Sequence, residues 1–427
     1  MAADHPTPPT DAPSAAAPAA DGAAARSVAG SAVEVARFFG WLSLVGFGGP
    51  AAHLAVMRRE LVERRGWLSA QEFMDLLGAT QLIPGPNSTE MAIHIGYRRA
   101  GLRGLIVGGL SFIVPAALIT LLLSSLYLRY GRLPRVQPVL VGIQASVVAV
   151  VALAVWALGR TALHSRGLWL LGLAALVASL AGVPELIVFF GGGLLYLLAV
   201  SWVGPWLRRR RGAGMAPSGW LLPLLAVGLS SLRLWLPLAL AAGPLGQVAA
   251  LAPTVSLTAL ALFFAKVGSV IYGSGYVLVA LLLRGLVDER GWLPRAVLLD
   301  AVAIGQVTPG PVFTTATCVG YLLRGSVGAL VATAAIFAPS FALVWGLDTL
   351  LLRLRRSPQL RVFLDGVNAC SLGLLLATVL SLLLSLWQRG AHLWLGFSVG
   401  ALAVGIVAKL NPSWLIVAGA VAGALLA

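Results

Sequence analysis

Two Pro-Gly-Pro segments, at 84–86 and 309–311, carry the residues whose types and spacing could bind a small charged molecule. Gln81 precedes the first segment, Gln306 precedes the second, and small polar residues follow both. Proline in a helix removes a backbone donor and clashes with the preceding turn, so each segment predicts that one helix ends and another begins. The free N–H groups and the positive dipole at a helix start favour an anion. The pattern therefore predicts an anion site at two helix N-termini, with a pair of packing kinks as the alternative.

Two glycine-rich segments, 46–50 and 271–275, align with each other at an offset of 225 residues, the same offset as the Pro-Gly-Pro segments. Neither stands in the strand–turn–helix context of a nucleotide fingerprint. In a membrane helix such glycines either allow close helix approach or break the helix beside a ligand. Lys266, the only lysine expected inside an apolar span, could supply a counter-charge to an anion or could extend to the interface. The predicted substrate-binding residues are Gly48, Gly49, Gln81, Pro84, Gly85, Pro86, Asn87, Ser88, Lys266, Gly273, Ser274, Gly275, Gln306, Thr308, Pro309, Gly310, Pro311, Thr314 and Thr315.

Four ionisable residues near these segments are candidates for coupling, because charged groups inside apolar spans are costly and often functional. Glu90 and His94 are four residues apart and share a helix face just after the first break. They could couple a proton, or they could make a structural hydrogen bond. Asp75 and Asp300 occupy the same place relative to the two glutamines. Each could cap a helix, pair with a loop arginine or gate a cavity.

The two breaks belong to a longer internal repeat. The segment 65–68 aligns with 290–293, and after a shift of one residue Gly142 aligns with Gly366. Two repeats with breaks at matching places indicate a carrier with a binding site near the middle of the membrane.

The composition indicates an all-α polytopic membrane protein. Hydrophobic residues make up 59% of the 427 residues and charged residues 11%, and the mean hydropathy is +0.92. Apolar runs long enough to cross a bilayer predict about 13 spans, about six in each repeat and one in a connector. The spans are expected at about 36–57, 74–97, 105–128, 138–159, 168–182, 185–206, 219–241, 255–283, 296–322, 327–352, 362–387, 392–408 and 413–427.

An odd number of spans before the second copy would place the two repeats in opposite orientations. With a cytoplasmic N-terminus, nineteen arginines and lysines fall on the cytoplasmic side and nine on the other, as the positive-inside rule favours. The sequence thus predicts inverted repeats with a periplasmic C-terminus, although the basic residues of 58–65 lie on the disfavoured side. The expected domains are a disordered cytoplasmic tail at 1–30, a first repeat at 31–212, a connector with one transmembrane helix at 213–252, and a second repeat at 253–427.

Other classes of protein fit the sequence less well. The net charge of +15 lies mainly in short arginine-rich loops, which is typical of topology signals and lipid headgroup contacts rather than of nucleic-acid binding. Cys318 and Cys370 are expected to be small buried residues without a disulfide. The sequence has no nucleophile elbow, metal-ligand set or Walker loop, so we expect neither an enzyme nor a cofactor nor a bound metal. A membrane hydrolase using Glu90 and His94 and a lipid-handling scaffold are the alternatives. The sequence does not decide whether the protein forms a homo-oligomer.

The matched segments resemble the chromate ion transporter family in its long, two-domain form. The resemblance covers nearly all of 35–427, and it is strongest at 264–276, which includes Lys266, and at 300–321, which includes the second Pro-Gly-Pro segment. It implies an inner-membrane carrier that expels chromate and thereby confers chromate resistance, with sulfate as a structural mimic. The residues alone predict only a carrier, of an anion, driven by an ion gradient, the membrane potential or exchange.

Overall fold

The computed structural model describes residues 31–47, 49–131, 133–203, 255–272, 275–354, 357–388, 390–408, 410 and 412–426, and these residues form helices without a strand. The expected tail at 1–30 and the expected connector span at 219–241 lie outside the described residues. Within the described part, four helices are long and apolar enough to cross a membrane: Asn87–Tyr130, Gln137–Arg160, Val312–Gly346 and Pro358–Gln388. The predicted class, an all-α membrane protein, is confirmed.

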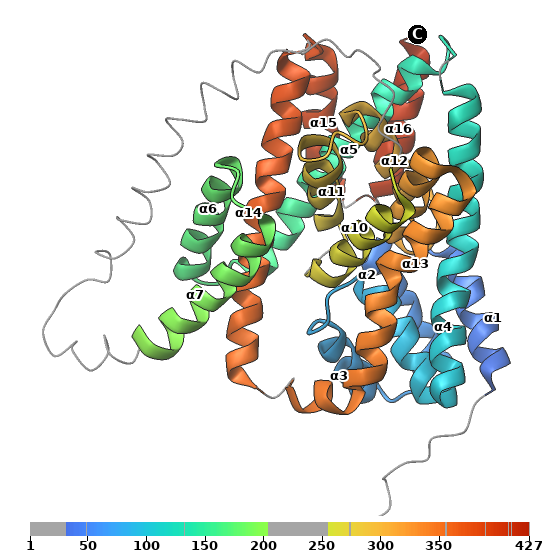
Figure 1. The fold of residues 1–427 in the computed structure, drawn as a ribbon, viewed down its shortest axis with the longest axis vertical. Helices are drawn as coiled ribbons and strands as arrows, with labels where there is room; N and C mark the ends of the chain where they lie inside the picture. The colour runs from blue at the N-terminus through green and yellow to red at the C-terminus, as the bar shows by residue number, and fades with distance from the viewer. Residues whose placement is uncertain are drawn as a thin grey trace, which may run out of the picture.

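The elements follow one another in nearly the same order in the two halves of the chain (Figure 1). The first half contains α1 (Ala32–Val45), α2 (Gly49–Met57), η1 (Arg58–Arg64), α3 (Ala70–Thr80), α4 (Asn87–Tyr130), α5 (Gln137–Ala162), α6 (Arg166–Leu180), η2 (Ile187–Gly191), α7 (Gly192–Leu198) and η3 (Ala199–Val203). The second half contains α10 (Leu257–Val270), α11 (Val277–Leu282), η4 (Leu283–Asp288), α12 (Arg295–Val307), η5 (Val312–Thr314), α13 (Thr315–Leu354), α14 (Pro358–Gln388), α15 (His392–Ala408) and α16 (Pro412–Leu425).

Equivalent residues in the two halves make equivalent local contacts. In the first half the Arg65 guanidinium lies 5.0 Å from the ring centroid of Phe38 and 5.7 Å from that of Trp67. In the second half Arg290 lies over the aligned Phe263 and Trp292 at 5.0 and 5.5 Å. These cation–π contacts attach the segment before α3 to α1, and the segment before α12 to α10. The sequence match at 65–68 and 290–293 therefore reflects the same packed unit built twice.

The long helices α4 and α13 each contain a sharp reversal. Backbone angles leave the helical region at Ala100 and Gly101 in α4, and at Arg324 and Gly325 in α13. Gly101 and Gly325 have φ of +57° and +63°, which glycine adopts most easily. A Cβ on Gly96 would fall on the carbonyl oxygen of Gly104, so the segments before and after the reversal pack backbone to backbone as a hairpin.

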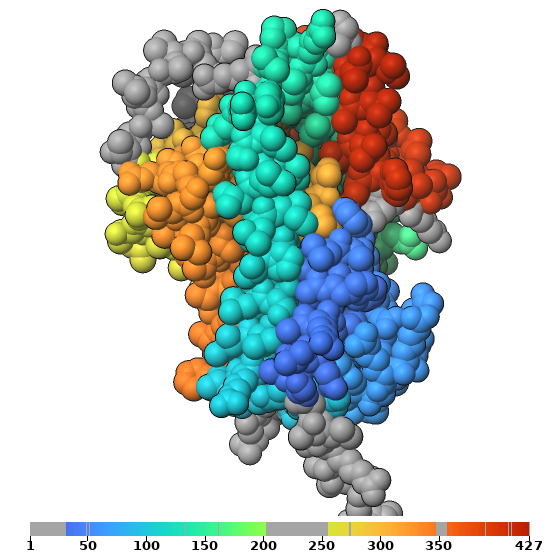
Figure 2. Space-filling model, turned by 90° about the vertical axis from the view of Figure 1, so that its right-hand side faces the viewer, coloured from blue at the N-terminus to red at the C-terminus, as the bar shows by residue number. Residues whose placement is uncertain are grey.

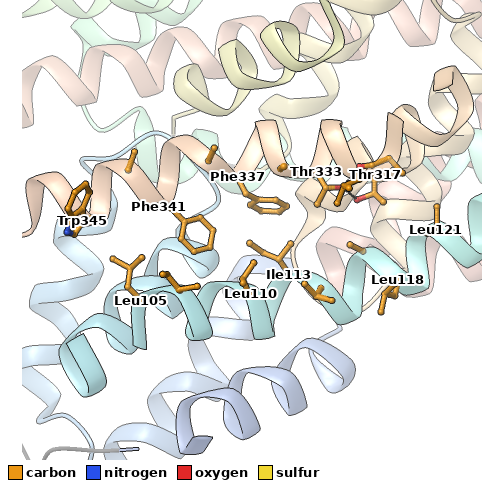
Figure 3. Close-up of a pocket in the computed structure, with 18 of the residues that line it drawn as sticks. Leu105, Leu110, Ile113, Leu118, Leu121, Thr317, Thr333, Phe337, Phe341 and Trp345 are labelled. Carbon is orange, nitrogen blue, oxygen red and sulfur yellow. Dashed lines mark hydrogen bonds between the residues drawn. The ribbon is translucent and has the colours of Figure 1, made fainter. Parts of the chain in front are cut away.

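The longer arms of these two hairpins pack against each other and run in opposite directions. Figure 3 shows Leu105 of α4 opposite Trp345 of α13, whereas Leu118 lies toward Thr333, so numbers rise along one helix as they fall along the other. Figure 2 shows α4 at the surface between α1 and α13. In Figure 1 the described chain begins at the lower end, at α1, and ends at the upper end, at α16.

Two of the expected continuous spans are broken into pairs of shorter helices. The span at 36–57 consists of α1 and α2, and that at 255–283 consists of α10 and α11. The residue that follows α1 is Gly46, where φ and ψ are −78° and 80°, and the residue that follows α10 is Ile271, which is extended. Of the two roles expected for the glycine-rich segments, helix breaking is therefore the one seen. Cys318 and Cys370 are buried and free, as predicted.

Candidate functional site

The two Pro-Gly-Pro segments break the chain as predicted. The first separates α3, which ends at Thr80, from α4, which begins at Asn87. The second separates α12, which ends at Val307, from the helical turn η5 that leads into α13. All six Pro-Gly-Pro residues are buried. Backbone without regular helical bonds is thus enclosed by protein, which is the condition for such backbone to lie within a membrane.

Each break is bonded to the opposite half of the chain. The Gly85 N–H donates to the carbonyl of Ile271 at 2.8 Å, and the Gly310 N–H donates to the carbonyl of Gly46 at 3.0 Å. Gly46 and Ile271 are the aligned residues that directly follow α1 and α10. Four broken helices, two from each half, are therefore joined by a symmetric pair of backbone hydrogen bonds.

Glycine is required at the centre of each break. Gly85 has φ of +140° and Gly310 has φ of +92°, conformations that other residues rarely adopt. A Cβ on Gly310 would lie 2.7 Å from the Cβ of Ala116 and 3.1 Å from Oγ of Ser43. A Cβ on Gly85 would meet the Glu90 carboxyl group and, at 2.8 Å, Oγ of Ser340. The close approach of the two halves therefore depends on the missing side chains.

Several polar atoms beside the breaks have no hydrogen-bond partner among the residues that the structure describes. After the first break these are Oγ of Ser88, Oγ1 of Thr89 and Oε2 of Glu90, all on fully buried residues. Before the second break it is the Nε2 amide of Gln306, whose residue is 7% exposed. Buried polar groups are normally bonded, so each such group calls for an explanation. A polar ligand between the breaks would supply the missing partner for an amide or hydroxyl donor.

The threonines around the second break are committed to their own backbone. The hydroxyl of Thr308 donates to the carbonyl of Ile304 at 2.7 Å. Those of Thr314 and Thr315 donate to the carbonyls of residues 311 and 312, both at 2.9 Å. The predicted capping of a helix start by these hydroxyls is not seen, because each donates to a carbonyl three or four residues earlier. They keep only lone pairs for a ligand. Among the side chains predicted around the second break, Gln306 is thus the available donor.

The other predicted binding residues lie at different distances from this centre. Gln81, the equivalent of Gln306, is exposed, and Asn87 is half-buried. Gly275 is buried, with the position of a Cβ 3.9 Å from Phe313, and a Cβ on Gly49 would lie 4.0 Å from Oη of Tyr276. These contacts bring the two glycine-rich segments close to residues of the second half. Gly48, Gly273 and Ser274 lie outside the described residues.

Lys266 is not gathered with the residues of the breaks. It is exposed on α10 and lines a cavity of about 20 Å³ together with Glu185, Glu289 and Arg290. The neighbouring Arg284 pairs with Glu185 at 3.1 Å and with Glu289 at 3.3 Å. The surroundings of Lys266 are therefore a network of charges, and its role as counter-charge to an anion stays a prediction.

The acidic coupling candidates connect the two halves of the chain. Glu90 is fully buried, and its Oε1 accepts a 2.6 Å hydrogen bond from the hydroxyl of Ser340, next to Pro339 in α13. Asp300 is 4% exposed and accepts bonds from Oη of Tyr127 at 2.7 Å and Nε2 of Gln144 at 2.9 Å.

The other two coupling candidates, His94 and Asp75, both lie in the first half of the chain. His94 is buried on the same helix as Glu90. The aligned Asp75 accepts a bond at 3.0 Å from Gln71 of its own helix. Sequence reasoning missed Ser340 and Gln144, although each lies within two residues of an aligned position, Pro339 or Gly142. Proximity to an aligned residue, combined with polarity inside an apolar run, was the available signal.

A larger cavity of about 690 Å³ between α4 and α13 does not resemble an anion site (Figure 3). Its lining is almost wholly apolar, with leucine, alanine and aromatic side chains from both helices. The hydroxyls of Thr317 and Thr333, which line one end, bond to each other at 2.7 Å. An oxyanion would lose its hydration there without gaining donors.

Comparison with known proteins gives one family. The family model described as a chromate transporter matches residues 33–197 and again 258–424. The chain is 31% identical over 400 residues to a probable chromate transport protein of Synechococcus elongatus, covering 92% of this chain and 95% of that protein. Chromate transport proteins of Cupriavidus metallidurans and Pseudomonas aeruginosa are each 31% identical, covering 82% and 89% of this chain and the same shares of their own lengths. No solved structure matches the chain.

Proposed function

The chain belongs to the chromate transporter family, and we propose that it is a secondary active transporter that exports chromate, or a related sulfate-like oxyanion, across the bacterial inner membrane and thereby confers chromate resistance. The observation that carries the proposal is the joined pair of breaks, with the unpartnered Gln306 amide beside them. A tetrahedral dianion needs several donors that converge from more than one direction. Two helix starts, an amide and nearby hydroxyls are groups of that kind.

Three observations support the proposed inversion of the repeats, an arrangement suited to transport by alternating access. The aligned arms of α4 and α13 run antiparallel, the local packing around Arg65 recurs around Arg290, and the bonds of Gly85 and Gly310 exchange between the halves. In transporters built this way, the substrate lies where the repeats meet, near the bilayer midplane. We place the substrate between the two breaks for this reason.

The proposed orientation has a cytoplasmic N-terminus and a periplasmic C-terminus. The excess of arginine on one side of the predicted spans supports it. The positions of α1 and α16 at opposite ends of the described molecule agree with it (Figure 1).

Proton coupling through Glu90 is the proposed source of energy, with exchange for another anion as the alternative. Burying a carboxylate without a charged partner is costly, so a fully buried glutamate in a transporter is a candidate proton carrier. Glu90 lies directly after the first break and bonds to Ser340 of the other half. A proton gained or lost there would alter a contact between the halves.

Flux measurements in inverted membrane vesicles test the function. We expect labelled chromate to accumulate in vesicles that contain the protein, faster with an imposed pH gradient, and sulfate to compete. Replacing Gln306 by alanine removes one donor to a charged acceptor, which weakens chromate binding about tenfold. The matched control is Gln359→Ala, because Gln359 is an exposed glutamine at the start of α14, away from the breaks. Sulfate flux without chromate flux would favour the alternative, a sulfate carrier, and flux of neither anion would overturn the proposal.

A further inference from the structure

The equivalent helices α3 and α12, which lead into the two breaks, are packed differently. Each helix packs against both long helices, α4 and α13, and against the short helix before it, η1 or η4, but α12 alone also packs extensively against α5 and α16. Leu299 of α12 is 6% exposed, but the aligned Met74 of α3 is 51% exposed. Gln306 is likewise 7% exposed, and its equivalent Gln81 is exposed. These two residues that lead into the second break are therefore covered by other helices, whereas the two equivalent residues that lead into the first break are exposed.

A buried carboxylate holds α12 in its covered position. Asp300 accepts hydrogen bonds from Tyr127 of α4 and Gln144 of α5, at 2.7 and 2.9 Å. Both donors belong to the first half of the chain, so these bonds join the halves across the covered side. Hydrogen bonds to a charged acceptor are stronger than neutral ones, and a buried carboxylate that lost them would be left without compensation.

The residues for an equivalent closure exist on the other side. Asp75 of α3 aligns with Asp300, and Asn368 of α14 aligns with Gln144, at the register that also aligns Gly142 with Gly366. In this structure the contacts of Asp75 include a hydrogen bond accepted from Gln71 of its own helix. Asn368 is half-buried on α14, and α14 is the helix equivalent to α5. Closure of α3 on α14 would therefore form an Asp75–Asn368 pair that matches Asp300–Gln144.

We propose that Asp300 and Asp75 are alternating latches that close opposite sides of the transporter, Asp300 by bonding to Gln144 and Tyr127, and Asp75 by bonding to Asn368. This rests on the proposed function only in that it assumes two states that expose the breaks in turn. The structure has the Asp300 latch closed. In the other state α3 lies on α14, the Asp75 latch is closed, and α12 has moved away from α5. The carboxylate and the amide match between the two latches, but at the same register Tyr127 aligns with Leu351, so the Asp300 latch has one hydrogen bond more than the Asp75 latch.

Thiol labelling tests this without a transport measurement. A background with Cys318→Ala and Cys370→Ala carries a single reporter, either Gln306→Cys or Gln81→Cys, and intact protein in vesicles is treated with a membrane-impermeant maleimide from each side. We expect the reporter at 81 to react quickly and the reporter at 306 slowly. Asp300→Leu removes the acceptor of one latch at similar side-chain size. It should raise the labelling rate at 306 about tenfold and lower the rate at 81, the change expected for losing a hydrogen bond to a charged acceptor.

The matched variant is Asp75→Leu, which should change the two rates in the opposite direction or leave the reporter at 306 as protected as in the parent. Asp300→Asn serves as a milder variant, since its side-chain oxygen still accepts one bond, and it should give a smaller shift than leucine. If Asp300→Leu and Asp75→Leu expose position 306 equally, or if neither changes labelling, the latches do not exist. Opposite shifts in a protein that moves neither chromate nor sulfate would uphold the latches and reject the proposed substrate.

Discussion

Alanine at Gly310 is the substitution whose cost the structure defines best. The residue has φ of +92°, and a non-glycine residue with positive φ costs about 1–2 kcal/mol. The new Cβ would also lie 2.7 Å from the Cβ of Ala116, where an ordinary apolar contact needs about 4 Å. Relieving such overpacking costs about 1–3 kcal/mol more. We therefore expect Gly310→Ala to lower the free energy of unfolding by about 2–5 kcal/mol.

Gly325→Ala provides the matched control. Gly325 has φ of +63°, and a Cβ there has no atom within 4 Å, so only the backbone cost of about 1–2 kcal/mol remains. Thermal unfolding of the purified protein in detergent, followed by tryptophan fluorescence, should show a drop in Tm for Gly310→Ala at least twice that for Gly325→Ala. Chromate flux should be lost only in Gly310→Ala. Equal drops in Tm would show that the contact between the break and Ala116 is not as close as described, and would refute the reasoning.

Three further outcomes follow from the site. Lys266→Gln should lose most chromate transport and Lys266→Arg keep part of it if the charge matters; parent-like transport in both would mean that only the packed stem matters. Glu90→Gln keeps an acceptor for Ser340 but cannot carry a proton, so flux should lose its response to a pH gradient while anion exchange persists; an unchanged response would leave Glu90 a structural role. A reporter enzyme that is active only in the periplasm, fused at the carboxyl end, should be active, and activity of a cytoplasmic reporter there would reverse the topology.

The sequence was sufficient to predict what depends on local geometry. Helix ends at the two Pro-Gly-Pro segments follow from the missing proline donor and from the φ that only glycine adopts readily at residues 85 and 310. The aromatic units around Arg65 and Arg290 recur because the same residues recur at the same spacing. The breaks at Gly46 and Ile271 were less certain, since glycine in a membrane helix also serves close packing.

Contacts between the halves could not be derived in the same way. A backbone carbonyl carries no mark in the sequence, so nothing identified Ile271 as the acceptor for Gly85. The partners of Asp300 come from 156 and 173 residues away, beyond the reach of local spacing. For Lys266, hydropathy predicted a position inside an apolar span. It did not predict which face of the helix the side chain occupies. In the structure Lys266 is exposed on α10 and the aligned Trp41 is 45% exposed on α1, and hydropathy alone predicts neither exposure.

The backbone hydrogen bonds at the two breaks are equivalent in both halves of the chain, whereas the contacts of α3 and α12 differ. This difference distinguishes the elements that must move during transport from those that can stay in place. The bonds of Gly85 and Gly310 are nearly the same length, 2.8 and 3.0 Å, and join equivalent atoms. An exchange of conformation between the halves would convert each of these bonds into the other and leave the pair unchanged. The contacts of α3 and α12 differ between the halves, so they are the ones that such an exchange would alter. A substrate held between the breaks would therefore stay in place while α3 and α12 open and close around it, which is the behaviour that alternating access requires.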